Sequence, residues 1–498
     1  MTHPADIRRL PSGVPGLDAI LGGGIPEFSL TLIVGAPGVG KTTLAHQMMF
    51  SFATLARPAV FFSVYGEPPL KMLRYQQQFA FFRADMIGGA VRLVDLTEDI
   101  AAGDLDAVLA RIQEEVKALA PAFVFVDSFR SILVAAQRQA DGSRKLREFL
   151  YELGLFLTGW QTTTFLVGAN APEGGAPPIF TVADGLILLE QSIHRNSMVR
   201  KLQVLKMRGQ ATSPGVHTFR ITGEGIEAFP SATIRDDPGK VTGNPPSPPH
   251  STTRIAMGVE GLDAMLGGGL PAGYSLLVAG PSGSGKTILA TAFLAEGVRR
   301  GEPGVIVAFE QTPSQSRTPT IDNMVRAGQV GLINTRSLDL SIDEIVQRLV
   351  LRIQGMQAKR VVIDSLSGFE LAVAPTFRED FRESLFRMIA ALSSLGTTVL
   401  MTSELEDRYT DLRFSPYGSA FLTDAIIVQR YIEIASGLRR VISVVKVRGS
   451  AHSTEIRQYE IGDRGIAIGA RIDDYEGLLC GRPRRSEKPP AAARGRPA

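Results

Sequence analysis

The sequence predicts an α/β fold with two tandem domains, each built on a mostly parallel central sheet with flanking helices. Three observations support this prediction. An apolar run leads into a glycine-rich loop and then into a helix-like stretch, and this arrangement occurs twice in the chain. Each copy is followed by further continuous apolar runs, which are typical of parallel strands buried on both faces.

The first glycine-rich loop, residues 35–42, reads GAPGVGKT and fits the pattern G-x-x-x-x-G-K-[ST]. It lies between the apolar run 30–34 and a helix-like stretch, 43–50, which is the context that a phosphate-binding loop requires. Glycines let backbone N–H groups turn toward a phosphate chain, and the helix N-terminus adds partial positive charge. The pattern predicts that Lys41 reaches the β- and γ-phosphates and that the Thr42 hydroxyl binds Mg²⁺. The predicted nucleotide contacts are Gly35, Gly38, Val39, Gly40, Lys41, Thr42 and Thr43. A glycine-rich turn without a ligand is the alternative interpretation.

The same pattern returns at residues 280–287, GPSGSGKT, after the strand-like run 274–279. The similarity extends upstream, because residues 13–24 and 258–269 share the pattern G-V-x-G-L-D-x-x-L-G-G-G. The two loops begin 245 residues apart, so the repeat is a whole domain rather than a short solenoid unit. The predicted nucleotide contacts of the second loop are Gly280, Gly283, Ser284, Gly285, Lys286, Thr287 and Ile288.

Each predicted domain continues with further buried strands. Residues 59–64 and 304–309 come first, 162–167 and 397–402 follow later, and 183–189 and 423–428 come last. Between the first two of these, the runs 123–126 and 361–363 end at Asp127 and Asp364. Ligands of open α/β sheets bind at the carboxyl ends of the strands, so we expect these aspartates to help hold Mg²⁺. A strand-ending turn aspartate is the simpler interpretation of each.

A basic pair closes each half. Lys206 and Arg208 alternate with Met207 on a predicted strand, and Lys446 and Arg448 alternate with Val447. Alternate side chains of a strand share a face, so the two cations of each pair point the same way and favour an anion. The γ-phosphate of a nucleotide on an adjacent subunit would serve, and a solvated strand face is the simpler interpretation.

Composition indicates a globular chain of two to four domains in 498 residues. The net charge of +3 is too small to indicate nucleic-acid binding, and the single cysteine excludes an intrachain disulfide framework. With no apolar signal core and no run long enough to span a membrane, we expect a cytoplasmic protein. We predict a first domain at 1–235, a Pro-rich linker at 236–250, a second domain at 251–480 and a disordered Pro/Arg-rich tail at 481–498.

These motifs resemble the KaiC family, whose members carry two RecA-like P-loop NTPase domains. The resemblance covers about residues 8 to 480 and rests on the G-V-x-G-L-D segments, the loops, the aspartates and the two K-x-R-G sequences. It implies a homohexameric double ring with ATP and Mg²⁺ at the subunit interfaces. Residues 206–208 and 446–448 would reach across to the neighbouring nucleotide, and Arg440 matches a further nucleotide-contacting arginine. In some members the first domain is an ATPase, and the second is an autokinase and phosphatase.

The chain departs from the family at the reacting carboxylates. The family carries two adjacent glutamates after the second strand, whereas residues 65–67 here read YGE and residues 310–311 read EQ. We therefore expect Glu310 to be the general base of the second domain and to lie at its metal site. Glu67 stands one position late, which favours firm binding and slow hydrolysis in the first domain. The predicted catalytic residues are Glu310, Glu67, Lys41, Lys286, Arg208 and Arg448, and the predicted metal-site residues are Thr42, Asp127, Thr287, Glu310 and Asp364.

Two further departures concern the clock proteins of the family. Their adjacent Ser-Thr phosphorylation pair corresponds here to Ala420 and Phe421, which have no hydroxyl, and the tail differs from their partner-binding segment. A clock role is therefore not expected.

The sequence favours an ATPase that acts at subunit interfaces of a ring and reports its nucleotide state to a protein partner. A serine/threonine autokinase with shifted acceptors, such as Ser415, Ser419 or Thr423, would use the same ATP site. The RecA-like core also permits a DNA-binding ATPase, which the near-neutral charge disfavours. A nucleotide-stabilised scaffold is the non-enzymatic interpretation of the same motifs.

Overall fold

The computed structural model describes residues 7–64, 69–101, 104–137, 142–169, 178–194, 197–231, 253–309, 318–334, 341–373, 381–405, 422–434, 436–473, 475–480 and 484–485. The chain forms two compact units, residues 1–231 and 232–498, which we call the first and second units. The predicted linker and most of the predicted tail lie outside the described residues, and the domain boundaries stay predictions.

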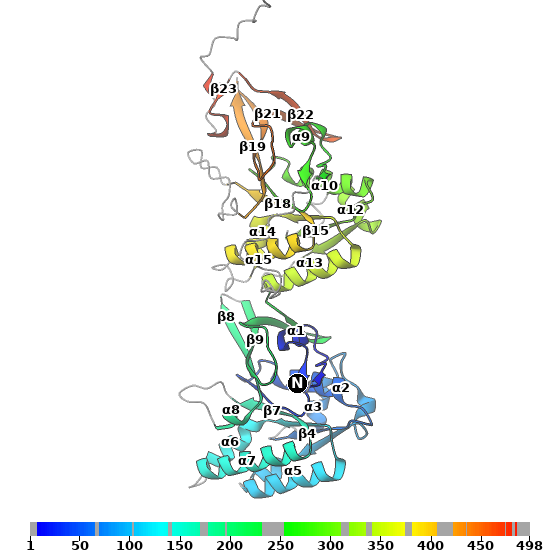
Figure 1. Ribbon diagram of the computed structural model, residues 1–498, viewed down its shortest axis with the longest axis vertical. Helices are drawn as coiled ribbons and strands as arrows, with labels where there is room; N and C mark the ends of the chain where they lie inside the picture. The colour runs from blue at the N-terminus through cyan, green and yellow to red at the C-terminus, as the bar shows by residue number, and fades with distance from the viewer. Residues whose placement is uncertain are drawn as a thin grey trace, which may run out of the picture. The chain divides into compact units, whose positions relative to one another are not determined.

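The first unit contains a nine-stranded sheet among its described residues (Figure 1). The strand order is β11-β10-β9-β8-β3-β7-β6-β4-β5. Strands from β8 to β5 pair in parallel, whereas β8 to β11 form an antiparallel extension. The bounds are β3 Leu30–Gly35, β4 Ala59–Ser63, β5 Val91–Asp95, β6 Phe123–Asp127, β7 Thr163–Ala169, β8 Gly185–His194, β9 Ser197–Met207, β10 His217–Thr222 and β11 Gly225–Phe229.

Two apolar layers form because neighbouring side chains of each strand face opposite sides of the sheet. Phe61 packs with helix α2, Lys41–Phe52, on one face, whereas Phe62 packs with the α5 side on the other. Helix α5, Leu105–Leu119, shows how the sequence sets such a layer. Asp104 accepts hydrogen bonds from the first turn, and apolar residues recur at helical spacing toward the core. The other helices are α1 Leu17–Leu21, α3 Pro69–Gln76, η1 Ala84–Met86, α4 Thr97–Ala101, α6 Phe129–Gln137, α7 Gly142–Gly159 and α8 Pro178–Val182.

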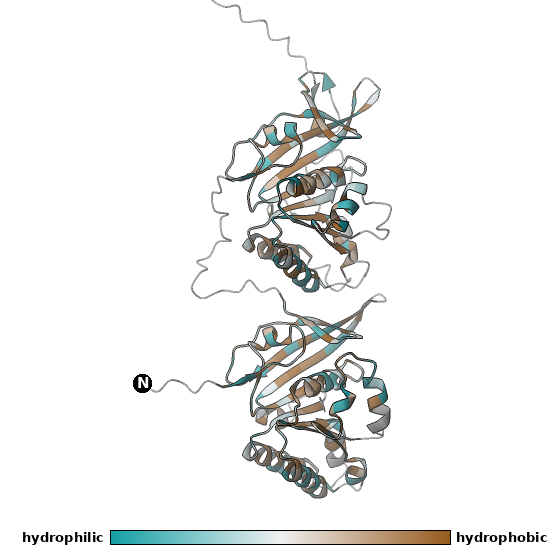
Figure 2. Cartoon of the chain, turned by 90° about the vertical axis from the view of Figure 1, so that its right-hand side faces the viewer, coloured by the Kyte–Doolittle hydropathy of each residue, from teal (hydrophilic) through white to brown (hydrophobic). Residues whose placement is uncertain are grey.

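The second unit repeats this architecture strand for strand. Its described sheet has the order β16-β15-β17-β18-β14-β19-β20-β21-β22, which is the order of the first unit read from the other edge. In both units the central strands are predominantly hydrophobic and the flanking helices carry hydrophilic residues (Figure 2). The structure thus confirms the predicted α/β fold with mostly parallel sheets. The strands are β14 Ser275–Gly280, β15 Gly304–Ala308, β16 Val330–Asn334, β17 Arg360–Asp364, β18 Thr398–Glu404, β19 Ala425–Ile434, β20 Gly437–Val447, β21 Arg457–Gly462 and β22 Gly465–Arg471. The helices are α9 Glu260–Met265, α10 Lys286–Arg299, α12 Pro319–Arg326, α13 Ile342–Met356, α14 Leu366–Ala372, α15 Phe381–Ser394 and η4 Leu478–Cys480.

The G-V-x-G-L-D segments have a structural use. In the first unit the Asp18 carboxylate accepts the N–H of Ser12 at 2.9 Å, and in the second the Asp263 carboxylate accepts the N–H of Met257 at 2.6 Å. These bonds fasten the segment before α1 or α9, and short antiparallel pairs lie beside it. The pairs are β1 Arg9–Leu10 with β2 Ile25–Pro26, and β12 Arg254–Ile255 with β13 Leu270–Pro271. In the last part of the second unit, β23 Tyr475–Glu476 pairs with β24 Arg484–Arg485.

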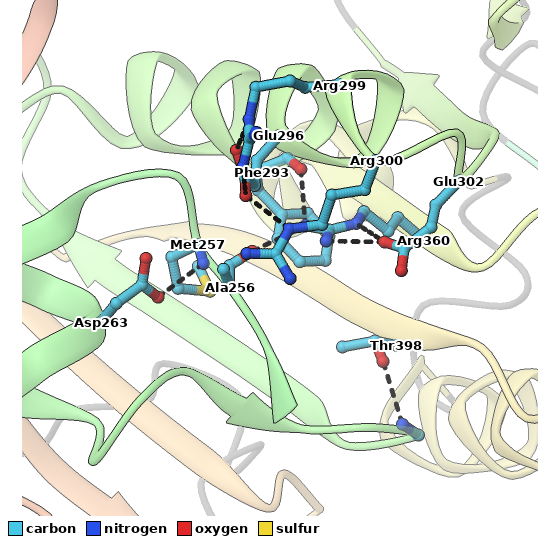
Figure 3. A network of polar contacts seen from close by, with 11 residues as sticks. Ala256, Met257, Asp263, Phe293, Glu296, Arg299, Arg300, Glu302, Arg360 and Thr398 are labelled. Atoms are coloured by element: carbon cyan, nitrogen blue, oxygen red, sulfur yellow. Dashed lines mark hydrogen bonds and ion pairs between the residues drawn. The ribbon is translucent and has the colours of Figure 1, made fainter. Parts of the chain in front are cut away.

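A buried arginine distinguishes the second core from the first. Arg360 begins β17 with its side chain fully buried, and it forms an ion pair with Glu302 at 2.7 Å (Figure 3). The guanidinium also donates to the carbonyls of Ala256 and Phe293 and lies over the Phe293 ring. Burial lowers the pKa of Arg360, whereas Glu302 acts to raise it. The first unit has Phe123 at the start of β6, the matching position.

Candidate phosphate-binding sites

Both glycine-rich loops lie at the carboxyl edge of their sheets, near the middle strand. The first joins β3 to α2 and the second joins β14 to α10, as the sequence predicts. In each sheet the loop strand is flanked on both sides by parallel strands, so the ends of several strands surround the loop. This edge is where open α/β sheets bind ligands.

Glycines allow the backbone of the first loop to turn tightly. Gly38 and Gly40 have φ angles of 79° and 111°, a region that other residues rarely adopt. A side chain at Gly38 would meet no atom within 4 Å, so the loop is open there. The Lys41 ammonium donates to the carbonyls of Gly35 at 2.9 Å and Ala36 at 2.8 Å. The lysine therefore crosses the loop that should hold the phosphates.

The second loop has the same geometry. Gly283 and Gly285 have φ angles of 74° and 98°. The Lys286 ammonium donates to the carbonyls of Gly280 at 2.8 Å and Pro281 at 2.7 Å. Val39 of the first loop and Ser284 of the second are fully buried, so their side chains anchor the loops. Thr43 and Ile288 lie in the first turns of the following helices and are half-buried.

A threonine and an aspartate meet behind each loop. Thr42 donates its hydroxyl hydrogen to Asp127 at 2.6 Å, and Thr287 donates to Asp364 at 2.8 Å. The predicted threonine and aspartate of each metal site are thus in direct contact, because β6 and β17 end beside the helix that follows the loop. Glu310, the remaining predicted metal-site residue, lies outside the described residues.

These oxygen donors suit Mg²⁺ that arrives with a nucleotide. Mg²⁺ prefers oxygen ligands and usually keeps waters and phosphate oxygens beside one or two carboxylates. Among the residues that the structure describes, no group of three or more His, Cys, Asp or Glu side chains could hold a metal ion. A site built from one hydroxyl, one carboxylate and the phosphates of the ligand fits this arrangement.

The two sites differ in charge. Burial lowers the pKa of Lys41; Asp127 opposes the shift, and Arg130 adds to it. Burial also lowers the pKa of Lys286, but there the carboxylates of Glu404 and Asp364 both oppose the shift. A second cation thus stands near the first lysine, and a second carboxylate near the other. The sequence analysis missed Arg130 and Glu404 because nothing in the chain order places them beside the loops.

The family of the chain follows from comparison with known proteins. A family model described as "ATPase: KaiC" matches residues 10–233 and 255–472, one match for each unit. The chain belongs to the KaiC family. It is 27% identical over 496 residues to the circadian clock oscillator protein KaiC of Picosynechococcus sp. PCC 7002, covering 96% of this chain and 93% of that protein. It is 26% identical over 497 residues to the KaiC of Synechococcus elongatus PCC 7942, covering 96% and 92%. The predicted resemblance is therefore confirmed, and the chain is a KaiC-like ATP-binding protein.

In this KaiC-family chain the basic pairs do not lie beside the loop of their own unit. Met207 is in register with Gly185, which pairs with Thr31 near the amino end of β3, whereas the first loop begins at Gly35. Four residues of a strand separate these positions by about 13 Å. Lys206 donates to the carbonyl of Ala183 at 2.5 Å.

The other cations of these pairs are held in the same way. Arg208 donates to the Asp184 carboxylate at 3.2 Å. Lys446 donates to the carbonyl of Thr423 at 2.7 Å, and Arg448 to the Asp424 carboxylate at 3.3 Å. Val447 is in register with Ala425, so this pair also lies at the amino edge.

Arg440, by contrast, lies beside the second loop. It pairs with Tyr459 across β20 and β21, and the Tyr459 hydroxyl donates to the carbonyl of Ser284. Its guanidinium also lies over Tyr431, 5.6 Å from the ring centroid. The sequence analysis missed the matching residue of the first unit, Arg200, which pairs with Phe219 on β10. The available signal was spacing, since each arginine stands six residues before the lysine of its basic pair.

Several predicted residues cannot be placed. Glu67, Glu310, Ser415 and Ser419 lie outside the described residues, as do Ala420 and Phe421. Thr423 is described and fully buried, so its hydroxyl is inaccessible as a phosphate acceptor in this structure. No helix in the described part of the chain is long and apolar enough to cross a membrane.

Proposed function

We propose that the chain binds ATP with Mg²⁺ in both units, hydrolyses it at the subunit interfaces of a homohexameric ring and presents its nucleotide state to a protein partner. The observation that carries this proposal is the twofold occurrence of one geometry. In each unit the loop lysine donates to a carbonyl at the start of its own loop, while a threonine and an aspartate meet behind the loop.

Each residue has a distinct role in this proposal. Loop N–H groups, the helix N-terminus and the lysine hold the β- and γ-phosphates. Thr42 with Asp127, and Thr287 with Asp364, hold the metal site, where Mg²⁺ neutralises charge on the transferring phosphoryl group. Arg440 and Arg200 approach the nucleotide from the antiparallel extension.

We propose that hydrolysis occurs mainly in the second unit, and strand register supports this. The N–H of Phe309 donates to the carbonyl of Asp364, and the N–H of Val64 donates to that of Asp127, so these residues are equivalent. The next residues are Glu310 in the second unit and Tyr65 in the first. The position that carries the proposed base therefore has no carboxylate in the first unit, where we propose slow turnover.

The positions of the cations support the proposed interface location. Arg208 and Arg448 stand at the opposite sheet edge from their own loops, so they would contact a γ-phosphate only in another copy of the chain. A ring supplies such a copy at every interface, with the arginine stabilising charge that develops during phosphoryl transfer.

Complementation between two inactive variants tests this proposal. Lys286→Ala and Arg448→Ala should each abolish most ATP turnover, and mixing them should restore part of it, because random assembly makes about a quarter of the interfaces intact. Light scattering with and without Mg²⁺ and ATP would report ring size. Full activity of Arg448→Ala alone, or no restoration in assemblies that demonstrably mix, would contradict the interface site.

A further inference from the structure

Glu404 lies directly beside the second loop. It ends β18 in register with Gly280, the first residue of the loop. The N–H of Leu405 donates to the Gly280 carbonyl at 3.2 Å, and the same carbonyl accepts the Lys286 ammonium at 2.8 Å. The backbone at Glu404 is therefore fixed next to the lysine that should hold the phosphates.

The side chain of Glu404 faces the metal site. Thr402, two residues earlier on β18, donates its hydroxyl hydrogen to Asp364 at 2.5 Å. Leu400 packs on the same face, with Leu289 and Phe293 of α10. Because alternate side chains of a strand share a face, Glu404 points to this side, one step beyond Thr402 and toward the ligand.

Glu404 carries its charge near Lys286 without an ion pair between the two side chains. It is exposed, and it forms no hydrogen bond or ion pair with any residue in the described part of the chain. Its charge nevertheless reaches Lys286, since it opposes the fall of the Lys286 pKa. A carboxylate this close to a bound triphosphate would repel it. We therefore expect the Glu404 carboxylate to accept hydrogen bonds from another group at this position.

The first unit supplies an internal contrast. Its matching strand β7 ends at Ala169, and Val167 stands beside Asp127 where Thr402 stands beside Asp364. The register of β7 also shifts by one residue, so that Val34 lies opposite Ala169. The described part of β7 ends opposite Val34, one position short of the place that Glu404 has beside Gly280. At the Thr402 position the first unit has Val167, which lacks a hydroxyl, although the loop, threonine and aspartate are the same.

We propose that Glu404 orients the attacking water in the second site and that Thr402 positions Asp364 for this reaction. This inference rests on the proposed function and adds a second carboxylate to its mechanism. The Glu404 carboxylate accepts one hydrogen of the water, which turns a lone pair toward the γ-phosphorus. The water oxygen bonds to the γ-phosphorus while the bond from this phosphorus to the oxygen that bridges the β- and γ-phosphates breaks. ADP leaves with the electron pair, Glu310 takes one proton of the water, and the other stays on the phosphate.

Glu404→Ala tests the proposal in the full-length chain. We expect the single-turnover rate at saturating ATP to fall about 100-fold, the scale of losing a positioned carboxylate. The second measurement is ATP binding, followed with a fluorescent ATP analogue. The binding that remains in Lys286→Ala gives the contribution of the first site. In Glu404→Ala, ATP binding should be unchanged or roughly two- to threefold tighter, because a repelling charge is removed. Glu404→Asp should recover part of the rate.

Glu383→Ala is the matched control, since Glu383 is exposed on α15, which packs on the opposite face of the sheet. A rate for Glu404→Ala within twofold of this control would overturn the inference. Loss of ATP binding in parallel with the rate would also overturn it, because Glu404 would then only support the loop. If Lys286→Ala kept full turnover, the assignment of hydrolysis to the second unit would fail as well. Loss of turnover in Lys286→Ala with a normal Glu404→Ala would refute the water-orienting role alone.

Discussion

The metal-site aspartates of the two units, Asp127 and Asp364, accept different sets of hydrogen bonds. Asp364 accepts hydroxyl hydrogens from Thr287 and Thr402, whereas among the described residues Asp127 accepts one from Thr42 only. Burial raises the pKa of Asp127 above its ordinary value of 3.8, against the opposing effects of Thr42 and Lys41. The first site thus holds a carboxylate whose ionised form is poorly stabilised until a cation arrives.

The pH dependence of the first unit should show this. A raised pKa means that the folded state binds the proton more tightly than the unfolded chain, so stability falls as pH rises from about 3.8 through the folded pKa. In Asp127→Asn that fall should vanish, and the unliganded first unit should be more stable at pH 7 than in wild type. Thermal unfolding across pH would measure both.

Nucleotide supplies the control for this variant. With ATP and Mg²⁺ at about a hundred times Kd, wild type should gain about 2.7 kcal/mol, and Asp127→Asn should gain clearly less. Equal stabilisation of the two proteins would show that Asp127 does not hold the metal.

Residue patterns predicted the loops and the strand-ending aspartates because each motif is local and its chemistry depends on fixed spacing. These patterns could not predict the role of Glu404. Its place beside Lys286 depends on β18 pairing with β14, a contact between distant parts of the chain, and no spacing rule encodes which strands become neighbours. Arg200 could have been found, because its spacing to Lys206 repeats that of Arg440 to Lys446.

At the scale of elements, the predicted parallel core is the part that sequence describes well. Buried parallel strands are continuous apolar runs and stand out, as residues 123–126 and 361–363 do. The antiparallel extension was only partly visible. β9 covers Ser197–Met207, but only its basic end was predicted, because polar residues such as Arg200, Lys201 and Gln203 leave no continuous apolar run.

The Arg360 network is another element-scale feature, since it joins β17, α10 and the segment before α9. Glu302→Ala would leave the buried guanidinium without its ion-pair partner. We expect the second unit to lose about 2–4 kcal/mol of unfolding free energy, since removing one partner of a buried pair is strongly destabilising. Urea unfolding followed in the full chain would measure this.

The same unfolding experiment contains its control. The transition of the first unit should stay in place, because its core residues lie within its own unit. Arg360→Met should be milder than Glu302→Ala, because it removes the charge together with its need for a partner. A change below about 0.5 kcal/mol in Glu302→Ala, the range of ordinary surface substitutions, would show that the pair is not a stabilising contact.

At the scale of the whole molecule, the question is where the γ-phosphate goes. The clock-type acceptor pair is replaced by Ala420 and Phe421, and the shifted candidate Thr423 is fully buried. We therefore expect free phosphate to account for all of the ATP consumed, with no stable phosphate on the protein. Phosphopeptide mapping after incubation with ATP, in parallel with phosphate release, would check this. Phosphate on Ser415 or Ser419 would establish an autokinase instead.

The matching strand order of the two units has a consequence for how the chain changes over time. Among the described residues each unit has the same nine strands in its sheet, and each apolar cluster is composed of residues from one unit alone. The two units therefore have separate cores within one chain. A substitution that alters one site leaves the core of the other untouched, so each copy is free to specialise. Val167 and Thr402, which occupy the same position beside the two aspartates, are one result of that freedom.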